Sequence, residues 1–199
     1  MEDSSAPGII LITGPKHSGK TSAGAFLAKL LAAEFVDLDE LVERQTGKTP
    51  RALFREGSGL FRQAETRALS SLLSAEPRES GVPLVVAAGG GLIDNAGARE
   101  LLRRPEFSGT GTVIVCLEVT ADTAWERILA EAERTGEWPA FLNAEDPRQA
   151  NAAIHERRGA AYREIAALTV NGEGKTAEDI GREIALSLLR RLPLLRLPF

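Results

Sequence analysis

The chain has 199 residues, of which 43% are hydrophobic and 26% are charged, and its formal net charge is −4. These values are typical of a soluble globular protein, and the single cysteine, Cys116, excludes a framework of disulfides. The basic residues form no sustained stripe, so we expect no nucleic acid as a partner.

The length fits a single domain over residues 1–199, and no apolar run reaches the ~20 residues that a membrane-spanning helix needs. The N-terminal segment carries Glu2 and Asp3 and lacks the basic start of a signal peptide. We therefore expect a cytoplasmic protein without a membrane partner, and we expect it to act as a monomer.

Five short apolar runs predict the strands of a sheet, at 9–13, 34–37, 83–88, 112–119 and 168–170. Helical signals lie between them: an amphipathic pattern over 61–73, and proline-containing helix starts at Thr49-Pro50 and Asp146-Pro147. A capping pattern at Thr176 opens the last helix. Strands that alternate with helices form a parallel sheet covered on both faces, so we predict an α/β fold.

A phosphate-binding motif joins the first predicted strand to the first predicted helix. Residues 14–21 read Gly-Pro-Lys-His-Ser-Gly-Lys-Thr and fit the spacing G-x-x-x-x-G-K-[ST]. Backbone N–H groups of such a loop surround phosphate oxygens, the lysine reaches the outer phosphates, and the threonine hydroxyl serves Mg²⁺. The other interpretation is a glycine-rich turn with an exposed lysine, but the strand before and the helix after favour the phosphate loop. The ATP-binding residues are then predicted to be His17, Ser18, Gly19, Lys20, Thr21 and Ser22.

Two carboxylates follow the second predicted strand, at the edge of the sheet where ligands bind in such folds. Asp37 and Asp39 are two residues apart, so in an extended chain both side chains would face one crevice. One could hold Mg²⁺ while the other accepts a proton from a hydroxyl nucleophile. The alternative for Asp39 is that it only caps the next helix.

Three glycines, Gly89, Gly90 and Gly91, follow the third predicted strand and would let backbone N–H groups approach a ligand closely. The next helix is expected to begin near Asp94. Elsewhere, Arg62 and Arg158 are suited to bidentate capture of a carboxylate, although nothing in their spacing brings them together.

Several short motifs, taken in order, resemble the shikimate kinase family from about Gly8 to Leu192. They are residues 35–40 (Phe-Val-Asp-Leu-Asp-Glu), Gly47-Lys48-Thr49-Pro50, Leu53-Phe54, Phe61-Arg62 with Glu65, the three glycines, and Arg158 four residues before Tyr162. The resemblance implies a P-loop kinase that transfers the γ-phosphate of ATP to the 3-hydroxyl of shikimate, in aromatic amino acid biosynthesis.

The resemblance also implies the roles of individual residues. Lys20 and Asp39 would be catalytic, with Asp39 orienting the accepting hydroxyl and taking its proton; Thr21 and Asp37 would hold Mg²⁺. The shikimate-binding residues would be Asp39, Arg62, Gly90, Gly91 and Arg158, with Phe54 and Phe61 beside the ring. Residues 171–175 would lie against adenine.

The polar segment 131–149 has no clear periodicity and is expected to be a lid or binding loop, with a passive surface connection as the alternative. The resemblance implies that it is a lid that closes over both substrates. The family places an arginine before the lid proline, and this chain has Trp138 before Pro139. Arg134, Arg148 or Lys16 could supply the missing positive charge. The tail, about 193–199, contains Pro198 and cannot extend the last helix.

Two other functions fit part of the pattern. A related kinase for another small acceptor, such as gluconate, would keep the phosphate loop, but an Arg- and Trp-containing stretch typical of gluconate kinase is not evident. A catalytically silent ATP-binding relative would fit Trp138 but has little reason to keep Lys20, Asp39, Arg62 and Arg158 together.

Overall fold

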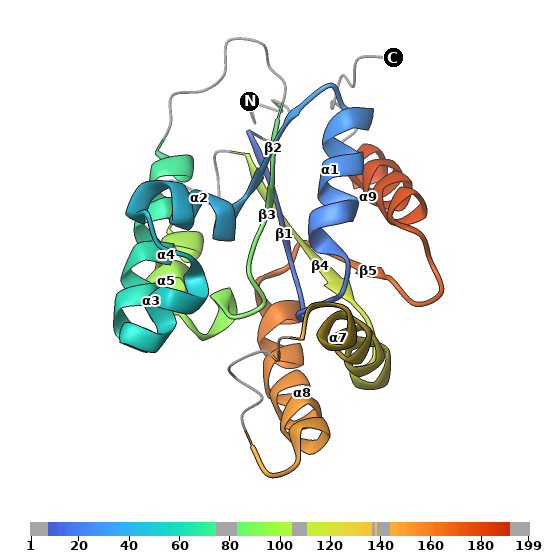
Figure 1. Ribbon diagram of the computed structural model, residues 1–199. Helices are drawn as coiled ribbons and strands as arrows, with labels where there is room; N and C mark the ends of the chain where they lie inside the picture. The colour runs from blue at the N-terminus through green and yellow to red at the C-terminus, as the bar shows by residue number, and fades with distance from the viewer. Residues whose placement is uncertain (1–7, 75–82, 105–110, 137, 139–143, 192–199) are drawn as a thin grey trace.

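Five parallel strands form the centre of the molecule, in the order β2-β3-β1-β4-β5 (Figure 1). The computed structural model describes residues 8–74, 83–104, 111–136, 138 and 144–191. The strands are β1 (Ile9–Thr13), β2 (Glu34–Asp37), β3 (Leu84–Ala87), β4 (Thr112–Glu118) and β5 (Leu168–Asn171). The parallel register, with Ile10 opposite Val85 on one side and Val113 on the other, confirms the predicted α/β sheet.

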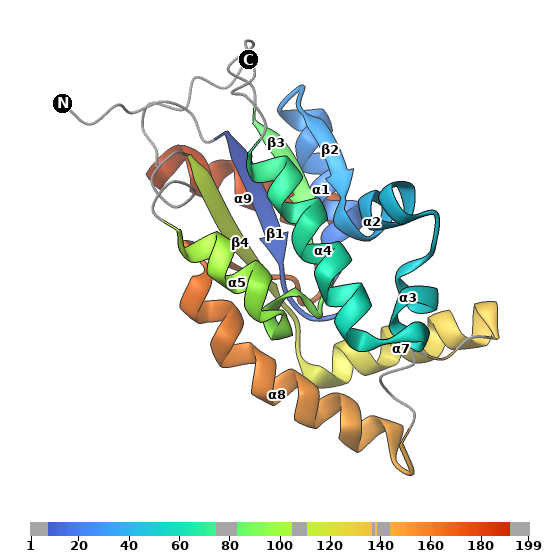
Figure 2. The same ribbon diagram turned by 90° about the vertical axis from the view of Figure 1, so that its left-hand side faces the viewer.

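Helices cover both faces of this sheet, as Figures 1 and 2 show. One face carries α1 (Lys20–Leu30) and α9 (Ala177–Arg191), and the other carries α2 (Leu38–Thr46), α4 (Ser58–Leu73) and α5 (Ala96–Arg103). The remaining helices are α3 (Pro50–Glu56), the 3-10 turn η1 (Leu92–Asp94), α7 (Ala121–Thr135) and α8 (Pro147–Ile165). None of the helices that the structure describes has the length and apolar character needed to cross a bilayer.

Each face of the sheet has its own apolar core. Leu27, Val115 and Ile184 are fully buried between the sheet and the α1–α9 pair. Leu11, Leu38 and other side chains fill the opposite side, beneath α2, α4 and α5. Burial on both sides explains why the strands read as continuous apolar runs rather than as alternating patterns.

The predicted helix starts at Thr49-Pro50, Asp146-Pro147 and Thr176 are confirmed. The Thr49 hydroxyl accepts from the Ala52 N–H at 3.1 Å. At Thr176 the capping is reciprocal, with the Asp179 N–H donating to the threonine hydroxyl and the Thr176 N–H donating to the Asp179 carboxylate.

Two boundaries differ from the sequence-based prediction. The helix expected near Asp94 is a 3-10 turn that ends there, followed by α5, which Asn95 caps. The segment 131–149 begins in a helix, because α7 continues to Thr135. The tail 193–199 and Pro139 lie outside the described residues.

The packing between α9 and the sheet predicts a contrast between two neighbouring side chains. We expect Ile184→Ala, at a position with 0% exposure, to lower the free energy of unfolding by about 2–5 kcal/mol through lost burial and a residual cavity. Leu186→Ala, at a position 54% exposed on the same helix, should change it by less than about 0.5 kcal/mol. Urea unfolding of both variants measures the difference, and equal losses would contradict this core.

Candidate active site

The predicted phosphate loop lies between β1 and α1, and two glycines give it its shape. Gly14 has a φ of 140° and Gly19 a φ of 97°, in the range that glycine adopts without strain. At Gly14 an added Cβ would also collide with the carbonyl oxygen of Leu117 in β4. The loop therefore lies directly against the end of the sheet, with α1 starting behind it.

Lys20 is buried in this loop, with 8% exposure, which rules out the exposed lysine of a simple turn. Its Nζ donates to the Pro15 carbonyl oxygen at 2.5 Å and to the Ser18 hydroxyl at 3.3 Å. Burial lowers the pKa of Lys20 to about 8, so the ammonium still carries its charge at neutral pH. Burial also lowers the pKa of His17 to about 4, so this imidazole is neutral there.

Thr21 and Asp37 form a hydrogen-bonded pair of oxygen-bearing side chains beside the loop. The Thr21 hydroxyl, at the first turn of α1, donates to Asp37 Oδ2 at 2.9 Å. The other oxygen of Asp37 accepts from the Asp39 N–H at 2.9 Å, so Asp37 caps α2 and Asp39 does not. The interpretation of Asp39 as a helix cap is therefore wrong, because the strand ends two residues earlier.

The three glycines lie next to three different parts of the site, with tight contacts at Gly89 and Gly90 and an ordinary van der Waals distance at Gly91. An added Cβ would lie 3.0 Å from Asp39 Oδ1 at Gly89, 2.9 Å from the Lys16 nitrogen at Gly90, and 4.0 Å from Arg158 Nη2 at Gly91. The segment thus brings together the carboxylate after β2, the phosphate loop and an arginine of α8. Burial, followed by the charge of Asp37, raises the pKa of Asp39.

Tyr162 fixes this segment from the side of α8. Its hydroxyl donates to the Gly90 carbonyl oxygen at 2.5 Å, and the side chain is 1% exposed. The ring lies in a small apolar cluster with Ile93 and Cys116, where burial raises the pKa of the Cys116 thiol to about 12. Cys116 is accordingly a structural cysteine.

The structure brings Arg62 and Arg158 together although α4 and α8 are far apart in sequence. Both contact Asp94 of η1: Arg62 donates to its backbone carbonyl oxygen, and Arg158 donates to its carboxylate at 2.6 and 2.9 Å. No site role was predicted for Asp94 or for Arg157, which also binds this carboxylate. Phe54 and Phe61 meet edge to face, 6.2 Å between ring centres, on the α3–α4 side.

Glu65 is a buried carboxyl group beneath these arginines, with 1% exposure. One of its oxygens accepts from Asn95 Nδ2 at 2.9 Å, and the other has no partner among the described residues. Burial raises the pKa of Glu65 to about 7. The same Asn95 amide also donates to the Arg62 carbonyl oxygen at 2.8 Å, so it joins α4 to the start of α5.

Arg127 is a site residue that the sequence reading missed. It lies on α7 and its Nη1 donates to the His17 carbonyl oxygen of the phosphate loop at 3.0 Å. A threonine cap at Thr120 and apolar residues at helical spacing (Ala124, Ile128 and Ala132) are the signals that predict this helix.

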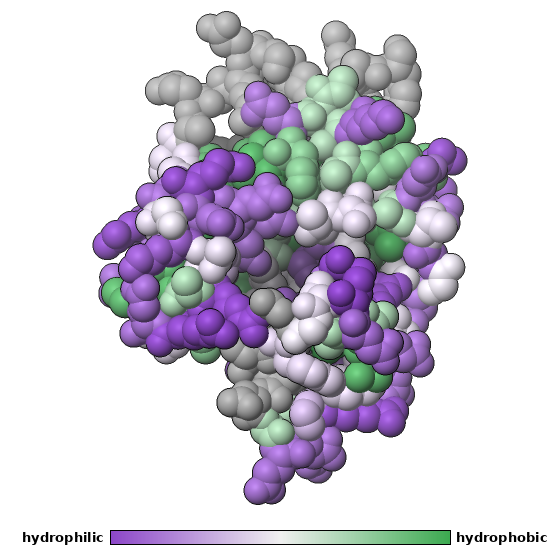
Figure 3. Space-filling view, in the orientation of Figure 1, coloured by the Kyte–Doolittle hydropathy of each residue, from purple (hydrophilic) through white to green (hydrophobic). Residues whose placement is uncertain are grey.

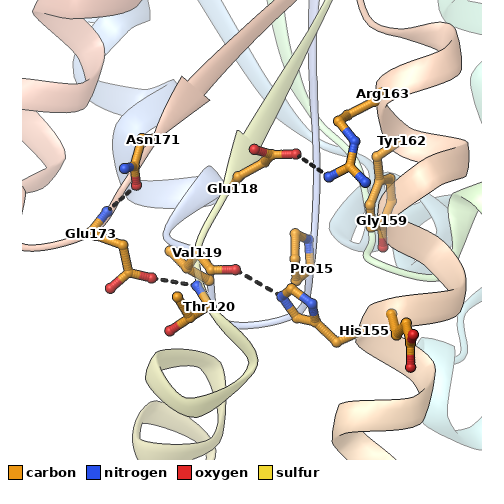
Figure 4. Close-up of a pocket in the computed structure, with 11 residues that line it drawn as sticks. Pro15, Glu118, Val119, Thr120, His155, Gly159, Tyr162, Arg163, Asn171 and Glu173 are labelled. Carbon is orange, nitrogen blue, oxygen red and sulfur yellow. Dashed lines mark hydrogen bonds and ion pairs between the residues drawn. The ribbon is translucent and has the colours of Figure 1, made fainter.

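A cavity of about 410 Å³ lies beside the phosphate loop, between Pro15, the end of β4, α8 and the residues after β5 (Figure 4). Glu173 ties the segment after β5 to the start of α7, since its carboxylate accepts from the Thr120 N–H and from the Thr123 hydroxyl. On the opposite wall His155 Nε2 lies 2.8 Å from the Val119 carbonyl oxygen. The residues expected near adenine therefore lie next to the loop.

Trp138, where the family places a lid arginine, is 43% exposed. Its ring lies 5.8 Å from that of Trp125 on α7, and its carbonyl oxygen accepts from Arg51 Nη2 of α3 at 3.0 Å. Arg134 pairs with Glu131 at 2.7 Å and Arg148 with Asp122 at 2.9 Å, both on the surface. Figure 3 shows hydrophilic side chains over α2 and α3 and a recess between them and α7.

The site combines a parallel sheet, a phosphate loop after its first strand, a carboxylate after its second strand, and arginines of α4 and α8. This combination is typical of the class of P-loop small-molecule kinases. The model of the shikimate kinase family matches residues 16–192. The shikimate kinase of Chlorobium chlorochromatii is 36% identical over 186 residues, covering 89% of this chain and 91% of that protein. The chain belongs to the shikimate kinase family.

Solved structures agree with this assignment. Shikimate kinase from Acinetobacter baumannii in complex with shikimate superposes with a TM-score of 0.77 at 32% identity, over 93% of this chain and 94% of that one. A gluconokinase from Sinorhizobium meliloti reaches a TM-score of 0.58 at 20% identity, over 96% and 97% of the two chains, and shows a shared fold only.

The raised pKa of Glu65 predicts a pH-dependent stability difference. A carboxyl whose pKa rises from 4.5 to about 7 on folding stabilises the folded state below pH 4.5, and this contribution is lost as the pH rises through 7. Between pH 4.5 and 8, the wild type should therefore lose up to about 3 kcal/mol of unfolding free energy relative to Glu65→Gln. Urea unfolding at several pH values measures this, with the exposed Glu43→Gln as control; parallel pH profiles for wild type and Glu65→Gln would contradict it.

Proposed function

We propose that this protein transfers the γ-phosphate of ATP to the 3-hydroxyl of shikimate, giving shikimate 3-phosphate and ADP. The observation that carries the proposal is the convergence at the three glycines, where Gly89 adjoins Asp39, Gly90 adjoins the phosphate loop and Gly91 adjoins Arg158. A phosphate donor and a hydroxyl acceptor bound on either side of this segment would meet between the loop and Asp39.

The donor half would bind ATP through the loop residues 17–22. The Lys20 ammonium is held at the loop by neutral oxygens rather than by a carboxylate, so its charge is available to the outer phosphates. No group of three or more His, Cys, Asp or Glu able to hold a metal occurs among the described residues. Mg²⁺ commonly uses one or two protein oxygens together with phosphates and water, which the Thr21–Asp37 pair fits. When bound there, Mg²⁺ would offset charge on the transferring phosphate.

The acceptor half would place the shikimate hydroxyl at Asp39. Its raised pKa makes this carboxylate a better proton acceptor than an exposed aspartate, and Lys20 and Lys16 lower that pKa in part by their charge. Arg62 and Arg158, with the N–H groups of Gly90 and Gly91, would bind the carboxylate of shikimate. Phe54 and Phe61 would lie against the ring.

We further propose that the enzyme works as a monomer in the cytoplasm, where ATP is abundant. We also propose that the segment around Trp138 acts as the lid. A lid would exclude water, which competes with the sugar-like hydroxyl for the phosphoryl group.

Coupled measurement of ADP release tests the activity. With Mg²⁺, ATP and shikimate, turnover should exceed that with gluconate or with no acceptor, and Lys20→Met should lower kcat at least a hundredfold because a preorganised charge is lost. Circular dichroism of the variant controls for folding. Turnover only with another acceptor would refute the substrate, and ATP binding without turnover would support a silent relative.

Lys16 is the cation that we expect to replace the lid arginine. Its charge acts on both Lys20 and Asp39, whereas Arg134 and Arg148 are engaged in surface ion pairs. Lys16→Met should lower kcat about ten- to a hundredfold, and Arg134→Ala and Arg148→Ala should remain within about twofold of wild type. Steady-state kinetics of the three variants decide between these positions; a large loss in either arginine variant would place the substitute in the lid segment.

A further inference from the structure

Asp94 is surrounded by three arginines from two helices. Arg157 donates to both carboxylate oxygens, with Nη1 to Oδ1 at 2.8 Å and Nη2 to Oδ2 at 3.0 Å. Arg158 donates to Oδ2 alone, from Nε at 2.9 Å and Nη2 at 2.6 Å, while Arg62 donates to the Asp94 backbone. The Asp94 carboxylate thus binds Arg158, one of the two arginines that the proposed function assigns to the carboxylate of the substrate, while Arg62 is held by the Asp94 backbone.

The two ion pairs of Asp94 differ in exposure. The side chains of Asp94 and Arg158 are each 14% exposed, whereas that of Arg157 is 61% exposed. Burial alone would raise the pKa of Asp94, but the hydrogen bonds from Arg157 and Arg158 outweigh it and lower the pKa, so the carboxylate is charged at neutral pH. With Asp94 and Arg158 alone, the two charges would cancel.

The contact geometry leaves part of Arg158 available. Both of its bonds to Asp94 fall on the Nε–Nη2 edge of the guanidinium, so Asp94 does not use the edge between Nη1 and Nη2. A cavity of about 440 Å³ adjoins this cluster and is lined by Arg62, Arg99, Arg157, Arg158 and Asp94, with Ile93 and Ala161. Four arginines line this cavity against one carboxylate, and Arg157 is the arginine that shares the Asp94 carboxylate with Arg158, so it offsets the negative charge that lies directly beside Arg158.

We propose that Arg157 is a specificity-determining residue for the acidic acceptor, because it offsets the charge of Asp94 and leaves that of Arg158 available to the carboxylate of the substrate. This inference rests on the proposed function. Arg157 is a positioning residue in this role, since it acts through Asp94 and Arg158. Asp94 at the same time holds the Nε–Nη2 edge of the Arg158 guanidinium. This contact fixes the direction in which the Nη1–Nη2 edge of the same guanidinium faces.

The test compares the wild type, a single variant and a double variant in steady-state kinetics with shikimate and with its uncharged methyl ester. Arg157→Gln should raise KM for shikimate about three- to tenfold with kcat within about twofold, the size expected for a partly exposed charge. KM for ATP and KM for the ester should stay unchanged. The double variant Asp94→Asn/Arg157→Gln should return KM for shikimate to within about twofold of wild type.

A matched control comes from a surface ion pair between α8 and α5, the helix that follows η1. Arg103 of α5 pairs with Glu164 of α8 at 2.5 Å on the surface, and Arg103→Gln should leave both constants unchanged. An unchanged KM in Arg157→Gln, an equal rise for the ester, or a double variant as impaired as the single one would overturn the inference while leaving the proposed function intact. A wild type that does not phosphorylate shikimate would overturn the proposed function and the inference with it.

Discussion

The close approach of the Gly89–Gly91 backbone to three other segments is the constraint on which the site depends. A Cβ at Gly90 would lie 2.9 Å from the Lys16 nitrogen, which is closer than real Cβ atoms come to backbone. The donor loop follows β1 and the glycines follow β3, and these two strands pair along their whole register. Sheet pairing therefore fixes the distance between the two halves of the site, and glycine allows that distance to be short.

The site also buries charged groups. Lys20 and Glu65 are buried and Asp39 is partly buried, and burial shifts the pKa of each towards the neutral form of its group. Lys20 and Asp39 partly compensate each other, because each charge moves the pKa of the other back towards its ordinary value. Glu65 has less compensation, with one oxygen unpartnered among the described residues, so the protonated form is favoured there.

The sequence predicted the strands and the phosphate loop because those signals are local. The strands are buried on both faces, and the loop motif consists of consecutive residues. What it could not predict depends on distant pairs: Asp94 meets Arg158 across 64 positions, and Arg127 meets His17 across 110. The helix cap is Asp37 rather than Asp39 for a different reason. The strand ends at Asp37, so Asp39 lies in the first turn of α2. The extended-chain argument no longer applies at that point.

Under the proposed function, Trp138 would attach the lid segment through its ring and its backbone, without a charged side chain of its own. Its ring contacts Trp125 of α7, and its carbonyl oxygen binds Arg51 of α3, so this residue connects the two sides of the recess. An aromatic contact and a backbone hydrogen bond can hold a segment in place, but neither offsets charge on a phosphoryl group. Positive charge for the transfer must then come from residues that are already at the phosphates. Lys20 and Lys16 belong to the loop itself, and their positions are set by the same β1–β3 pairing that positions the glycines. Under the proposed function, closure and charge compensation would therefore belong to different parts of the structure.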